Sequence, residues 1–143
     1  MKALVAKRAR ITRVRGVQHR IATAAAASAE AQVSTLETNA AKLASLRDSL
    51  SLASGDTTGA ILQNRGELAQ RLDKARDGLS SAIVSARAAA EQKIAERLDA
   101  RQQQEAAAKL DARAVQALST WTEARMAASF RPKGPRYAQQ GEN

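Results

Sequence analysis

The sequence contains no cysteine, a single histidine and only three aromatic side chains in 143 residues. The absence of cysteine excludes a disulfide scaffold, a zinc ribbon and a thiol nucleophile. No stretch approaches the roughly 18 consecutive apolar residues that a transmembrane helix needs. Because alanine supplies much of the 44% hydrophobic fraction, the chain can bury little apolar area, and we do not expect a thick core.

Recognisable catalytic motifs are also absent. The sequence has no phosphate-binding glycine loop, no GxSxG and no HExxH. A lone histidine in a basic helix, here His19, is more often a solvated side chain than a ligand. Carboxylate pairs such as Glu91 and Glu96 arise on any charged helix. We therefore interpret the protein as non-enzymatic and expect no catalytic, cofactor or metal site.

The residues that are present favour long helices. Pro132 and Pro135 are the only prolines, so none interrupts the first 131 residues. Apolar residues recur at steps of three and four, as in a coiled-coil seam. Gly16 weakens the first helix by about 1 kcal/mol relative to alanine and marks either a hinge or a close backbone approach. The stripe in residues 2–53 comprises Leu4, Ile11, Val14, Gln18, Ile21, Ala25, Ala29, Val33, Leu36, Ala40, Leu43, Leu46 and Leu50.

The segment Ser54–Gly59 interrupts this pattern with turn-forming residues. Gly55 is a helix stop signal, and Asp56, Thr57 and Thr58 are candidate N-caps for a second helix over 58–128. Its stripe begins with Ile61, Arg65, Leu68, Leu72, Ala75, Leu79, Ile83, Ala86, Ala90, Ile94 and Leu98, and it ends with Leu110, Ala114, Leu118, Trp121 and Arg125. Residues 129–143 have no periodicity, and we expect a disordered basic tail.

We predict an all-α fold, a long antiparallel two-helix coiled-coil hairpin over residues 1–128 with a disordered C-terminal tail. Folding at the break places residue i opposite about residue 113 − i. Val33 then lies near Leu79, and Val14 near Leu98. The same register leaves Leu118 and Trp121 projecting beyond the N-terminus. Trp121 is then either an exposed anchor or packed at the open end of the hairpin.

The positive charge is concentrated at the N-terminus. Residues 1–29 contain seven Lys or Arg and no acid, within a net charge of +9. This arm is either a docking surface for an anionic partner or a face balanced by Glu91, Glu96, Asp99 and Glu105. An Arg-rich, acid-free start is also typical of a mitochondrial presequence, but the helical pattern continues past residue 30.

Nucleic acid and a membrane surface are alternative partners for this arm. Nucleic-acid binding is disfavoured because the arm has no interleaved aromatics and no recognised DNA-binding module. A membrane surface could contact Leu4, Val5, Ile11 and Val14 with their flanking bases. The seam assignment weakens this interpretation, since it uses the same residues.

Residues 7–18, KRARITRVRGVQ, alternate bases with aliphatic side chains and precede an Ala/Glu-rich run that ends in Leu36-Glu37. Together with the charged second helix over 87–114, this pattern resembles the flagellar FliJ family and its injectisome counterpart YscO. Leu4 or Val5 stands where the family usually has a larger apolar or aromatic residue. The second helix is less acidic than is usual.

The resemblance implies a coiled-coil component of the type III protein export apparatus, a stalk or chaperone-type adaptor. Its implied partners are the export ATPase hexamer, an export-gate membrane protein and export chaperones. The implied location is cytoplasmic, at the inner face of the cell membrane. Carried over by position, the residues that would face the ATPase ring are Arg8, Arg10, Arg13, Arg15, Leu118, Trp121 and Arg125. The remaining hypotheses are a basic coiled-coil protein associated with nucleic acid and a structural coiled-coil oligomer.

Overall fold

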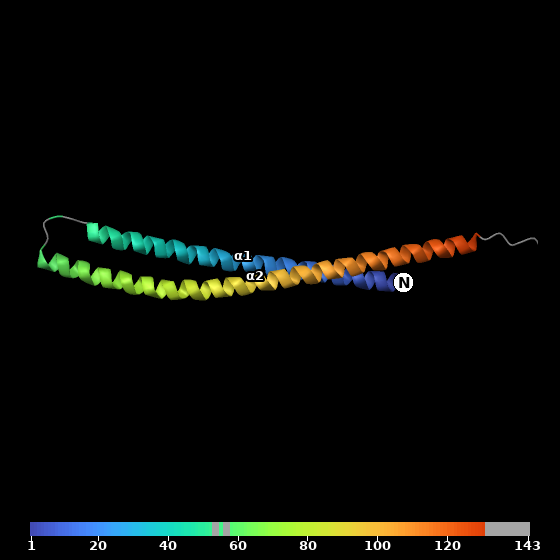
Figure 1. Ribbon diagram of the computed structural model, residues 1–143, viewed down its shortest axis with the longest axis horizontal. Helices are drawn as coiled ribbons and strands as arrows, with labels where there is room; N and C mark the ends of the chain where they lie inside the picture. The colour runs from blue at the N-terminus through green and yellow to red at the C-terminus, as the bar shows by residue number, and fades with distance from the viewer. Residues whose placement is uncertain (53–54, 56–57, 131–143) are drawn as a thin grey trace, which may run out of the picture. The chain divides into compact units, whose positions relative to one another are not determined.

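The structure is a computed structural model that describes residues 1–52, 55 and 58–130. It contains two α-helices, α1 (Lys2–Leu52) and α2 (Gly59–Ser129), and the described residues form no strand (Figure 1). The predicted all-α class is therefore confirmed. Of the predicted turn, only Gly55, Thr58 and Gly59 are described, and Gly59 is already the first residue of α2. The predicted tail beyond Phe130 lies outside the described residues.

Backbone hydrogen bonds define the helix ends. The Met1 carbonyl accepts hydrogen bonds from the N–H groups of Leu4 and Val5. At the start of α2, the Thr58 carbonyl accepts from Ile61 and Leu62. A residue that precedes the helix while its carbonyl accepts the first helical bond is an N-cap. Thr58 therefore occupies that position among the three predicted candidates.

The helices run antiparallel and pack against each other (Figure 1). Contacts between them show the direction, because Arg15 contacts Gln103 whereas Arg47 contacts Asp73. The chain divides into two compact units. The loop unit comprises Arg15–Gln104, and the terminal unit combines Met1–Val14 with the chain from Glu105 onward.

A heptad seam runs along both helices. On α1, one series of buried or half-buried positions alternates by three and four residues from Val5 to Leu50, as in a coiled coil. These seam residues are Val5, Arg8, Thr12, Arg15, His19, Ala22, Ala26, Ala29, Val33, Leu36, Ala40, Leu43, Arg47 and Leu50. On α2, half-buried or buried seam residues include Leu72, Leu79, Ile83, Ala86, Ala90, Lys93, Arg97, Ala100, Gln104, Ala107, Asp111, Ala114, Leu118 and Thr122.

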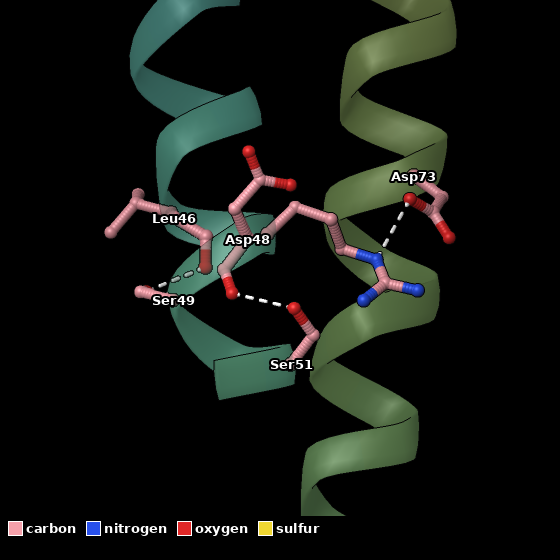
Figure 2. A network of polar contacts seen from close by, with 6 residues as sticks. Leu46, Asp48, Ser49, Ser51 and Asp73 are labelled. Carbon is pink, nitrogen blue, oxygen red and sulfur yellow. Dashed lines mark hydrogen bonds and ion pairs between the residues drawn. The ribbon is translucent and has the colours of Figure 1, made fainter. Parts of the chain in front are cut away.

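The seam differs from the predicted stripe at the beginning of α1. The predicted residues Leu4, Ile11, Val14 and Ile21 are exposed, and the seam uses the next residue in each case. A similar displacement exposes Leu46 and buries part of Arg47, whose Nε donates to the Asp73 carboxylate at 3.2 Å (Figure 2). On α2, Leu98 is exposed and Arg97 is half-buried. The displaced positions are therefore largely polar in the seam.

The register also differs from the prediction. Gly16 faces Gln104, and Arg47 pairs with Asp73, so in the loop unit residue i lies opposite about residue 120 − i. Val33 consequently lines a cavity with Ala90 rather than lying near Leu79. The shift of about seven residues equals one heptad, so the same faces of α1 and α2 still pack against each other. In this register the first residues of α2, about 59–67, extend past the end of α1.

The core is thin, as the composition predicted. Among the described residues, only Ala26 and Ala90 are buried, at 0% and 7% relative exposure. Alanine contributes little apolar area but is the best helix former. Much of the helix stability must therefore come from intrinsic propensity and many small seam contacts. Within the described residues, neither helix is long and apolar enough to cross a membrane.

Candidate partner-binding surface

The seven predicted partner-binding residues divide between the two units. The terminal unit contains Arg8, Arg10, Arg13, Leu118, Trp121 and Arg125, whereas Arg15 belongs to the loop unit. Arg10 and Arg13 are exposed, and Arg8 is half-buried at a seam position. The exposed pair is therefore available to a partner, while Arg8 also contributes its aliphatic stem to the seam.

Arg15 is held across the seam of the loop unit. Its Nη1 donates to the side-chain oxygen of Gln18 at 2.9 Å and to that of Gln103 at 2.5 Å. Gln18 is on the same helix and Gln103 is on α2, so the guanidinium group bridges α1 and α2. We therefore assign Arg15 mainly to the helix pairing.

Trp121 and Arg125 form the aromatic and cationic part of the terminal unit. The Arg125 guanidinium carbon lies 5.3 Å from the Trp121 ring centroid, within the range of a cation–π interaction. Trp121 keeps 43% of its surface exposed. Trp121 and Arg125 line an open hollow of about 640 Å³, together with Met1, Lys2 and Met126. Met1 and Lys2 line the same hollow, so Trp121 does not project beyond the N-terminus as the predicted register implied.

The terminal unit carries a strong positive charge. Residues 1–14 contain five bases and no acid, and residues 105–130 contain three bases and three acids, which gives a net charge of +5. Two of the four acids of α2 that were expected to balance the arm, Glu96 and Asp99, have partners on their own helix. Lys93 Nζ donates to Glu96 at 2.8 Å, and Gln103 donates to Asp99 at 2.8 Å. The hydrogen bond from Lys93 holds the pKa of Glu96 below its usual value.

Two polar atoms are buried in the seam of the terminal unit. Thr12 Oγ1 and Asp111 Oδ1 are shielded from solvent, and neither has a hydrogen-bond partner in the described part of the chain. A buried polar atom without a partner costs about 1–3 kcal/mol. The seam of this unit is therefore less stable than an apolar seam of the same length.

Sequence reasoning missed both the polar seam and the apolar residues that it displaces. The missing signal was the strict heptad spacing. Ala26, Ala29, Val33, Leu36 and Ala40 alternate by three and four, and extending that alternation toward the N-terminus gives the observed seam. The prediction instead followed the largest apolar residues, which lie one position away.

Comparisons with protein-family models, curated proteins and solved structures gave no match.

Proposed function

We propose that this protein is a non-enzymatic helical-hairpin component of a type III protein export apparatus, flagellar or injectisome. In this role it is a stalk or chaperone-type adaptor between the hexameric export ATPase and the export gate at the membrane. The proposal rests on the resemblance of residues 1–128 to the FliJ and YscO families. The antiparallel pairing of α1 and α2 agrees with the architecture that this resemblance implies.

The structural observation that best supports the proposal is the charge and exposure of the terminal unit. Residues 1–14 and 105–130 of this unit have a net charge of +5, with Arg10 and Arg13 exposed on α1 and Trp121 exposed on α2. A basic helix pair suits an acidic channel, because opposite potentials favour both encounter and orientation. Aromatic and arginine side chains are also the residues that most often dominate binding energy at interfaces.

Binding to the purified export ATPase tests this proposal. The double variant Arg10→Glu/Arg13→Glu should weaken binding at least about tenfold, which corresponds to about 1.4 kcal/mol. The matched control is Lys74→Glu/Arg76→Glu, which reverses two exposed bases in the loop unit and should retain affinity. Both variants change the net charge equally, so a difference between them reflects position.

The same preparation should be tested against duplex DNA over a range of salt concentrations. Binding to DNA with a steep salt dependence, together with no retention by the ATPase, would support the nucleic-acid alternative and contradict the proposal. Equal loss of ATPase binding in both double variants would show that only total charge matters.

A further inference from the structure

The terminal unit has an exposed apolar face beside the seam. Leu4, Ile11, Leu110 and Trp121 are each between 39% and 47% exposed, and Ala117 is exposed between Leu110 and Trp121 on α2. We call these five residues the apolar face. All five have apolar side chains, and the contacts between α1 and α2 leave them exposed.

The five residues lie on the same side of the helix pair. Each directly precedes a seam residue, as Ile11 precedes Thr12 and Leu110 precedes Asp111. Successive residues are separated by about 100° around a helix, so the face is displaced from the seam in the same rotational sense on both helices. In an antiparallel pair, residues displaced in the same sense are on the same side. The apolar face is therefore one surface that spans α1 and α2.

Basic side chains border this surface. Lys7 directly precedes the seam residue Arg8, and Arg113 directly precedes Ala114, so both lie on the same side as the apolar face. Arg125 lies over the Trp121 ring. Glu123 directly follows the seam residue Thr122 and lies on the opposite side. An apolar surface bordered by bases, with an aromatic ring beside a cation, is the composition of helices that lie in a membrane interface.

We propose that the apolar face docks on the surface of an anionic lipid bilayer. Leu4, Ile11, Leu110 and Trp121 enter the boundary between headgroups and acyl chains, and Lys7 and Arg113 bind anionic headgroups. Electrostatics favour an anionic bilayer over a second copy of the chain, because pairing two apolar faces would bring the basic side chains of both copies close together. The inference rests on the terminal unit alone and does not require the proposed export function.

Trp121 provides the measurement, because it is the only tryptophan in the chain. Its emission should shift to shorter wavelength on vesicles of phosphatidylcholine with phosphatidylserine, and the chain should sediment with them. Vesicles of phosphatidylcholine alone should produce neither effect. Replacing Lys7 or Arg113 with glutamine should weaken binding about fivefold each, since each base near an anionic surface contributes a similar factor.

The decisive pair of variants is Leu110→Glu and Val115→Glu. Both residues are exposed on α2, at 41% and 50%, but Val115 follows the seam residue Ala114 and therefore lies on the other side. Leu110→Glu should abolish the emission shift and sedimentation, and Val115→Glu should preserve both. Circular dichroism checks that each variant remains helical. Equal effects of the two variants, no binding to anionic vesicles, or a lipid-free dimer that Leu110→Glu dissociates would each overturn the proposal.

Discussion

Enlarging Ala26 tests whether close packing at this seam position limits the size of the side chain there. Ala26 has no exposed surface, so the three extra carbon atoms of Ala26→Leu have no free space. If space were available, each buried carbon would contribute about 0.8 kcal/mol. Overpacking a filled site instead costs about 1–3 kcal/mol. We expect Ala26→Leu to lower the free energy of unfolding by that amount.

Ala27→Leu is the matched control, because Ala27 is the next residue of the same alanine run and is exposed. It should change the free energy of unfolding by no more than about 0.5 kcal/mol. Urea denaturation followed by far-ultraviolet circular dichroism measures both variants, and two protein concentrations would reveal any coupled association. Identical denaturation midpoints for the two variants would refute the close packing at Ala26.

Three further changes test other positions. Gly16→Ala should raise the free energy of unfolding by up to about 1 kcal/mol, because alanine has the higher helix propensity. The added Cβ would make an ordinary contact, 3.7 Å from Gln104 Nε2. A lower thermal midpoint would instead support a hinge at Gly16. Asp111→Ala should raise the free energy of unfolding by about 1 kcal/mol more than Asp99→Ala does. Both variants gain helix propensity, but of the two aspartates only Asp111 has a buried oxygen without a partner among the described residues. Equal gains in a urea titration would contradict this prediction. Lys93→Met should raise the pKa of Glu96 toward its usual value of 4.5, because the hydrogen bond from Lys93 is the main cause that lowers this pKa. The titration of the Glu96 carboxyl carbon can be followed by NMR, and an unchanged titration would show that another group lowers the pKa.

The lowered pKa of Glu96 also determines how the contribution of the Lys93–Glu96 pair to folding stability changes with pH. A carboxyl whose pKa is lower in the folded state stabilises the fold above its unfolded pKa and loses that contribution as the pH falls through the folded pKa. The Lys93–Glu96 pair should therefore contribute at neutral pH and lose its contribution in acid, below about pH 4.5. Lys93→Met should remove this part of the acid dependence.

Composition and periodicity were sufficient to predict two helices and their antiparallel pairing, because no proline interrupts them and the turn signals cluster at residues 54–59. The register could not be predicted in the same way. A slip of one heptad presents the same faces to each other, so apolar matching at Val33 and Leu79 did not distinguish the alternatives. The contacts of Arg47 with Asp73 and of Gly16 with Gln104 distinguish the two registers, and neither contact involves an apolar side chain.

The candidate surface was predicted only in part. The bases Arg10 and Arg13 are exposed as expected, because two long charged side chains have no reason to enter a thin core. Four residues of the apolar face, Leu4, Ile11, Leu110 and Trp121, were assigned to the seam, because the prediction followed the larger apolar side chains. The structure places Val5 and Thr12 there instead, because continuity of the heptad along the whole helix outweighs the size of individual residues at its end.

The gradient of seam composition has a consequence for the order of folding. Most large apolar seam residues, such as Leu36, Leu43 and Leu79, lie in the loop unit. In the terminal unit Val5 and Leu118 share the seam with Thr12 and Asp111, whose buried polar atoms have no partner among the described residues. Contacts near the loop also close the shortest chain segments, which carry the smallest entropy cost. The helices should therefore zip from the loop toward the termini, and amide protons of the terminal unit should exchange fastest. We therefore expect the two ends to open reversibly while the pairing near the loop remains intact.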